Sequence, residues 1–178
     1  MSEASSVRER LMKALEESDV ARRKGRAERI EWLSLHNSRP GAIFGRTETM
    51  RILDEAPDAF VDGYFVGALL LATSFIEHAL AEELQDRGLA ERSPNFAEAV
   101  TLCREHGLFA PEWLDRTDAL RIMRNPYAHL KQPSHPHTMG NRYRSLKAHP
   151  LRMLEADAKE ALELMFFFFR ATLRQADF

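Results

Sequence analysis

Residues 57–88 of the 178-residue chain read PDAFVDGYFVGALLLATSFIEHALAEELQDRG. Apolar side chains recur in this stretch every three or four residues, which is the spacing that places them on one face of an α-helix. Proline suits the first position of a helix and glycine the position just after its end, so Pro57 and Gly88 mark the two ends. The stretch therefore predicts a long central helix carrying Phe60, Tyr64, Leu69, Ala72, Ile76, Leu80 and Leu84.

The segments on both sides of this stretch also have helical patterns. No stretch alternates apolar and polar residues between hairpin turns, so strands are not expected. We expect an all-α protein, with an N-terminal helical arm over residues 1–56 and a helical domain over residues 57–178. The remaining expected helices span residues 7–24 (with an extension to 36 left open), 47–55, 94–107, 111 to about 125, and 151–174, with loops at 37–45 and 132–150.

The composition is that of an ordinary globular protein. Hydrophobic residues make up 44% of the chain and charged residues 29%. Cys103 is the only cysteine, which excludes an intrachain disulfide. The N-terminus lacks the pattern of a secretory signal, and the longest uncharged run, of about 14 residues, is shorter than the roughly 20 that span a bilayer. We expect a cytoplasmic protein with no membrane partner.

Four consecutive phenylalanines lie in the last expected helix, at Phe166 to Phe169. Four successive positions cover the whole circumference of a helix, so one face cannot bury all four side chains in one core. We therefore expect some of them to contact a second subunit. Cover by the chain itself, including the N-terminal arm, is the alternative.

The charges are distributed unevenly. The formal net charge of the chain is only −2, yet residues 116–152 contain eight Lys and Arg side chains against the single acid Asp118. A basic segment on an otherwise acidic protein indicates a local site for a polyanion. A solvated basic loop with no ligand is the alternative.

The basic segment contains RNPYAHLK, residues 124–131. Arg124 and His129 are five positions apart, so on a straight helix their side chains point about 140° away from each other. Pro126 removes a backbone hydrogen bond and clashes with the preceding turn, so the helix is expected to end near Asn125 or to kink there. A kink would bring Arg124 and His129 into one cleft.

These two residue types suit the cleavage of RNA. A 2′-hydroxyl attacks the neighbouring phosphate when a base takes its proton and an acid protonates the leaving oxygen, and histidine titrates close enough to neutrality for either role. Arginine stays cationic and binds phosphate oxygens, so it stabilises the charge that develops in the transition state. The reaction needs no metal ion, and no metal or other cofactor is expected.

The motif R-N-x-x-x-H near the end of the third of four core helices resembles that of the HEPN superfamily, whose members are helical bundles. The resemblance covers about residues 57–175. It implies a HEPN-like four-helix bundle that acts as a metal-independent endoribonuclease, in a toxin, phage-defence or RNA-processing system, and that dimerises with the two motifs facing each other. It also implies that Arg124 and His129 are the catalytic pair, that Asn125 assists them, and that Glu77 is a supporting acid.

Three further residues are expected to bind the substrate. Arg121 and Lys131 would hold the RNA backbone, and Tyr127 would either stack on a base or pack beside the helix end. The expected partners are RNA and a second copy of the chain, with an antitoxin or another protein as a further candidate.

Other interpretations of the same residues stay open. A non-catalytic HEPN module would use the fold for dimerisation and bind a nucleotide or a partner protein. Arg124 and His129 would be a capping pair if they only complemented the dipole at the C-terminus of a helix. His129, His135 and His137 would ligate a metal ion, although the usual helical spacing and cysteine partners are missing.

Overall fold

The computed structural model describes residues 3–36 and 46–172, so the loop expected at residues 37–45 lies outside the described residues. Over those two ranges all regular secondary structure is helical, which confirms the expected all-α bundle. The helices are α1 Glu3–Ser34, α2 Thr47–Val61, α3 Phe65–Asp86, α4 Phe96–Glu105, α5 Pro111–Ala128, α6 Met139–Leu146 and α7 Pro150–Thr172.

The chain divides into two compact units, residues 1–38 and residues 39–178. The helix α1 of the first unit exposes most of its side chains to solvent, and ion pairs between residues four apart, such as Lys13–Glu17 and Lys24–Glu28, line its surface. Such pairs each add a few tenths of a kcal/mol to a helix. The helix expected over residues 7–24 is therefore present, and it continues to Ser34.

The second unit begins before α2, which corrects the domain boundary expected after residue 56. The helix α2 packs against α3 and α7, and it buries Leu53, Ala56 and Phe60 completely. A boundary at residue 56 would cut through this buried face. The physical reason for the error is that Thr47–Glu55 and Pro57 onward form one helix, because the burial of these side chains outweighs the missing backbone bond at Pro57.

The central helix also begins later than expected. The stretch 57–88 contains the end of α2, a turn at residues 62–64, and then α3. Gly63 in this turn has a φ of 83°, which side-chain-bearing residues rarely adopt, so the chain reverses there. The expected end is confirmed, because α3 stops at Asp86 and Gly88 has a φ of 68°.

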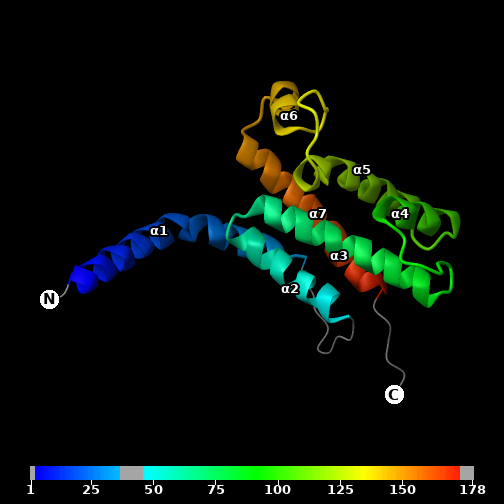
Figure 1. The fold of residues 1–178 in the computed structure, drawn as a ribbon, viewed down its shortest axis with the longest axis horizontal. Helices are drawn as coiled ribbons and strands as arrows, with labels where there is room; N and C mark the ends of the chain where they lie inside the picture. The colour runs from blue at the N-terminus through cyan, green and yellow to red at the C-terminus, as the bar shows by residue number, and fades with distance from the viewer. Residues whose placement is uncertain (1–2, 37–45, 173–178) are drawn as a thin grey trace, which may run out of the picture. The chain divides into compact units, whose positions relative to one another are not determined.

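In the second unit, α3 and α7 lie side by side, with α2 on one flank and α4 and α5 on the other (Figure 1). The helix α3 is the one described helix that is long and apolar enough to cross a membrane, but more than half of its apolar window is buried in the bundle. It therefore has the position of a core helix of the bundle. The cytoplasmic location stays a prediction.

The four phenylalanines of α7 are covered by the second unit itself, so the expected contact with a second subunit is not needed to bury them. Phe166, Phe168 and Phe169 are each less than 5% exposed. Phe167 stacks on Trp113 of α5, with the ring centroids 3.8 Å apart and the rings nearly parallel. The helix α7 packs against α2, α3 and α5, which together cover most of its circumference, and a subunit contact at the partly exposed Phe167 stays a prediction.

The local starts and ends of the later helices follow from capping. The helix α4 begins after Asn95, two residues later than expected. The Asn95 side chain accepts a hydrogen bond from the Glu98 amide, and the Glu98 carboxylate accepts one from the Asn95 amide. Pro111 is the first residue of α5, as expected. Within the expected loop at residues 132–150 lies a short helix, α6, which the sequence did not predict.

Candidate functional site

The predicted motif lies at the C-terminal end of α5, which does not stop at Asn125. The helix continues through Pro126 to Ala128, and the amide of His129 donates a hydrogen bond of 2.8 Å to the Asn125 carbonyl oxygen. The backbone of His129 is extended, with φ −140° and ψ 136°, so the chain leaves the helix at this residue. Pro126 has no N–H to donate to the carbonyl oxygen of Ile122, so one backbone hydrogen bond is missing from the last turn of α5.

Arg124 points into the bundle, toward α3 and the start of α4. Its Nη2 atom lies 3.4 Å from Oε2 of Glu77, and its guanidinium lies over the ring of Phe96, 5.7 Å from the ring centroid. The Arg124 side chain is 16% exposed, and within the described residues its buried Nε–H has no hydrogen-bond acceptor. Arg124 thus has a long contact to a carboxylate and one donor left for a ligand oxygen or a water molecule.

His129 lies outside this cluster. Its side chain is exposed, and it makes no hydrogen bond, ion pair or ring contact with the described part of the chain. The structure therefore brings Arg124 together with Glu77 and Phe96, but it does not bring His129 to the same cluster within one chain. Asn125 is half-buried, and its side chain is likewise without a described hydrogen bond.

Tyr127 packs beside the helix end, which was one of its two expected roles. Its hydroxyl is buried, has no partner at hydrogen-bonding geometry in the described ranges, and lies close enough to Arg142 and Asp157 to interact with their charges. Burial raises the pKa of the Tyr127 hydroxyl above its ordinary value. Because the hydroxyl of the half-buried Tyr127 lies inside the protein, its ring needs a rearrangement before it can stack on a base.

An ion pair that the sequence analysis missed lies beside Tyr127. Arg142 of α6 donates two hydrogen bonds to the Asp157 carboxylate of α7, one of them 2.7 Å long, and the two side chains are 12% and 7% exposed. The hydrogen bonds to Asp157 raise the pKa of Arg142. One signal was available in the sequence: Asp157 lies among the apolar positions of α7 that include Met153 and Ala161, and a buried acid requires a partner.

Ion pairs neutralise half of the cations in the basic segment. Arg121, expected to bind the RNA backbone, instead pairs with Asp118 at 2.8 Å, although it stays 23% exposed. The other paired members are Arg116, with Glu160 and Glu163; Arg124, with Glu77; and Arg142, with Asp157.

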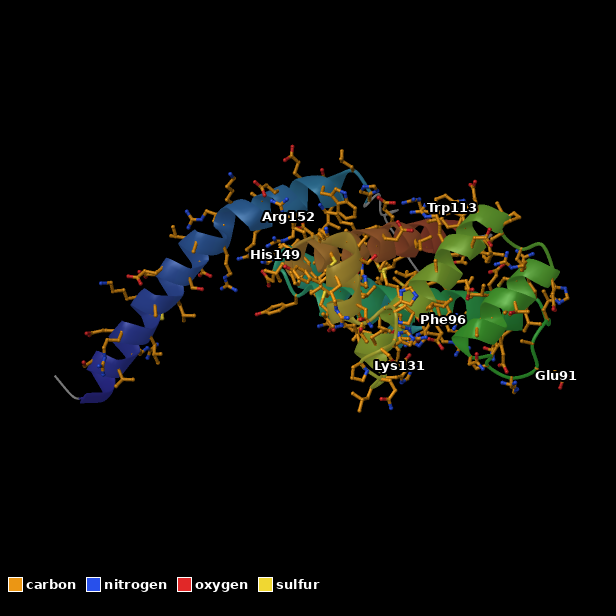
Figure 2. All side chains as sticks on the ribbon, turned by 90° about the horizontal axis from the view of Figure 1, so that it is seen from above. Glu91, Phe96, Trp113, Lys131, His149 and Arg152 are labelled. Carbon is orange, nitrogen blue, oxygen red and sulfur yellow. The ribbon has the colours of Figure 1, made fainter. Side chains whose placement is uncertain are left out.

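The other four cations are available to a ligand. No ion pair to the described part of the chain holds Lys131, Arg144, Lys147 or Arg152. Figure 2 shows Arg152 and His149 at the end of the bundle opposite Glu91. The electrostatic attraction for a polyanion therefore comes from the α6 region more than from α5 itself.

The histidines of the segment are not arranged as a metal site in the described ranges, where no group of three potential ligands is found. The His135 and His137 rings lie 5.8 Å apart, and the His137 amide donates a hydrogen bond to Nδ1 of His135. That bond uses one of the two nitrogens through which the His135 ring could bind a metal ion.

A groove of about 860 Å³ lies elsewhere, between residues 90–94 and α4. Its charged lining consists of Glu91, Glu98 and Glu105 with one cation, Arg92, which is paired with Glu98. An acidic groove repels the RNA backbone, so it does not suit the expected substrate.

No protein-family model, curated protein or solved structure matches the chain. The resemblance to the HEPN superfamily therefore rests on the motif and on the helical fold.

Proposed function

We propose that the chain is a metal-independent endoribonuclease of HEPN type that works as a homodimer. Arg124 would bind the scissile phosphate and His129 would transfer protons, with Asn125 assisting. A toxin or phage-defence setting is part of the same proposal.

One observation carries the proposal: the buried Nε–H of Arg124 has no acceptor, while His129, at the end of the same helix, is exposed and unengaged within the described residues. An unsatisfied buried donor costs about 1–3 kcal/mol. A phosphate oxygen would remove that cost and would form a charge-assisted hydrogen bond.

The proposed cleavage consists of two proton transfers and an attack on the phosphate. His129 would take the proton of a 2′-hydroxyl, whose oxygen then attacks the adjacent phosphorus. The bond from phosphorus to the 5′-oxygen breaks, and the departing oxygen takes up the proton that His129 gained. The products are a 2′,3′-cyclic phosphate and a 5′-hydroxyl, and Arg124 would stabilise the charge on the phosphate oxygens during the transfer.

The proposal needs a second copy of the chain. Arg124 and His129 of one chain do not meet, so a site built from the Arg124 of one copy and the His129 of the other supplies both groups.

The alternative from a different class is a non-catalytic helical module for dimerisation and for binding a nucleotide or a partner protein. The enclosure of Arg124 between Glu77 and Phe96 favours it, because a structural ion pair has the same surroundings. In this alternative His129 has no role and its replacement changes nothing.

The test uses two matched histidines, since His106 ends α4 as His129 ends α5, and both are exposed. We expect His129→Ala to abolish RNA cleavage and His106→Ala to retain it. Co-expressed Arg124→Ala and His129→Ala chains should regain activity, because their heterodimer has one intact site. Equal activity of the two histidine variants would support the non-catalytic module.

A further inference from the structure

The short helix α6 is attached to the rest of the bundle from one side. Arg142 pairs with Asp157 of α7, and the Asn141 side chain donates hydrogen bonds to the carbonyl oxygens of Pro133 and His135. No residue of α6 is buried. The helix is therefore held by polar contacts, and most of its surface faces solvent.

The surface of α6 away from Arg142 carries an aromatic ring and a cation, and a second cation follows at the helix end. With about 100° per residue, Tyr143 and Arg144 lie about 100° and 200° around the helix from Arg142. Lys147 comes directly after α6 and has a left-handed backbone, with a φ of 50°. All three are exposed, and Tyr143 keeps 51% of its surface accessible. We call Tyr143, Arg144 and Lys147 the α6 surface.

No acidic side chain competes for these cations. The sequence from residue 119 to residue 154 contains no Asp or Glu, and neither Arg144 nor Lys147 forms an ion pair with the described residues. Two further cationic or titratable side chains, His149 and Arg152, follow in the chain where α7 begins. The region thus has a positive charge that the protein itself does not neutralise.

We propose that the α6 surface binds single-stranded RNA, with Tyr143 stacking on a base and Arg144 and Lys147 contacting phosphates. An exposed ring beside unpaired cations is the combination that binds single strands, because a base stacks on the ring while the backbone follows the charges. A membrane surface fits less well, since the apolar face of this eight-residue helix consists of only Met139, Tyr143 and Leu146 and buries little in lipid.

This inference rests on the proposed function, because it names the surface that would hold the strand that His129 cleaves. It also changes the expected binding residues. Arg121 is paired with Asp118, so Arg144 takes the role of holding the RNA backbone that was expected of Arg121. The Tyr127 hydroxyl is buried, so Tyr143 takes the role of stacking on a base that was expected of Tyr127. Lys131 stays unpaired within the described part and keeps its expected role.

Gly140 offers a way to place a negative charge beside the α6 surface without disturbing the helix. It lies about 160° around α6 from Arg142, and a Cβ atom added there meets nothing within 4 Å. It is also the second residue of α6, where an acidic side chain favours the helix. A loss of binding in Gly140→Glu would therefore not reflect a weakened helix.

Ala97→Glu is the matched control. Ala97 is the second residue of α4, is exposed, and receives the same charge at the equivalent position of another helix. Gly140→Gln separates the size of the new side chain from its charge. All variants are made in the full chain carrying His129→Ala, so that cleavage does not consume the probe.

The measurement is the anisotropy of a fluorescein-labelled single-stranded RNA of mixed sequence, in excess EDTA and at several salt concentrations. We expect Gly140→Glu to weaken RNA binding about tenfold. Gly140→Gln and Ala97→Glu should each weaken RNA binding much less than this. Tyr143→Ala should weaken it at least about fivefold. Replacing Arg144 and Lys147 by glutamine should reduce the salt slope by about 1.4, which is 0.7 for each lost phosphate contact.

The outcomes separate this inference from the proposed function. Equal binding by Gly140→Glu and Ala97→Glu overturns the α6 surface, and so does binding to anionic vesicles with none to RNA. If the wild-type chain cuts RNA while Gly140→Glu, in the His129→Ala chain, binds RNA as well as its parent, the ribonuclease stands and this surface is wrong. If Gly140→Glu loses binding while the wild-type chain cuts nothing, the surface stands and the ribonuclease is wrong.

Discussion

Arg124 of α5 and Glu77 of α3 form an ion pair in the free chain, with Nη2 of Arg124 3.4 Å from Oε2 of Glu77. The carboxylate fixes the direction of the guanidinium, and it also competes with any phosphate for the same cation. The contact is long for a charge-assisted hydrogen bond, which is normally about 2.7–2.9 Å. Glu77 therefore orients the Arg124 side chain but forms only a weak hydrogen bond with it.

Glu77→Gln tests this competition. The glutamine keeps the shape of the side chain and removes its charge, so we expect a phosphate to bind Arg124 more easily. In chains that also carry His129→Ala, RNA affinity should rise about two- to tenfold, which corresponds to about 0.4–1.4 kcal/mol. Glu82→Gln, on the same helix, is the control and should have little effect. A lower affinity in Glu77→Gln would mean that orientation matters more than competition.

The pair of Arg142 and Asp157 should dominate the attachment of α6. Removing one partner of a buried pair leaves the other charge unpaired, so Arg142→Ala should lower the free energy of unfolding by about 3–5 kcal/mol. The double replacement Arg142→Met with Asp157→Leu should recover much of this loss. Urea denaturation of the three proteins measures both effects, and an unchanged midpoint in Arg142→Ala would show that the pair contributes nothing.

The phenylalanines of α7 should contribute to stability and not to assembly. Phe168 is fully buried, so Phe168→Ala should lower the free energy of unfolding by about 3–5 kcal/mol. Phe167 is partly exposed, so Phe167→Ala should lower it less. Neither replacement should change the oligomeric state in sedimentation experiments. Dissociation of an oligomer by Phe167→Ala would restore the subunit contact that the sequence suggested.

Cys103 should make the protein less stable at alkaline pH. Burial raises the pKa of its thiol to about 12, whereas an unfolded cysteine ionises near 8.5. Above about pH 8.5 the unfolded chain therefore loses its proton first, and the free energy of unfolding falls by up to about 1.4 kcal/mol per pH unit until about pH 12.

The corresponding measurement is a series of urea midpoints from pH 7 to pH 10 for the wild-type chain and for Cys103→Ala. The variant should show a smaller decrease over the alkaline part of this range. A thiol reagent should also modify the native wild-type chain slowly at pH 8 and quickly in urea. Parallel curves for the two proteins would exclude Cys103 as the source of the decrease.

The sequence predicted helix ends well where one residue determines them. Gly88 and Pro111 each act through their own backbone, and both ends lie where they were expected. The helix start predicted at Pro57 was wrong, because a proline is compatible with a first helical position and also with the inside of a helix that is stabilised by burial. Burial depends on tertiary packing, so the local sequence pattern could not distinguish these two positions.

The candidate site was only partly predictable for a related reason. The motif identified Arg124 and His129, but not that Arg124 turns inward toward Phe96 while His129 stays in solvent. The pairing of Arg142 with Asp157 joins two helices across a turn, and α6 carries no buried residue that would create an apolar pattern. Contacts of this kind follow from tertiary packing.

The chemistry of RNA cut by the full-length chain in excess EDTA tests the proposed ribonuclease most directly. We predict that the wild-type protein produces fragments ending in a 2′,3′-cyclic phosphate and a 5′-hydroxyl, and that folded His129→Ala and Arg124→Ala proteins produce none. RNA left intact by a folded wild-type dimer, or cut equally by all three proteins, would contradict the proposal.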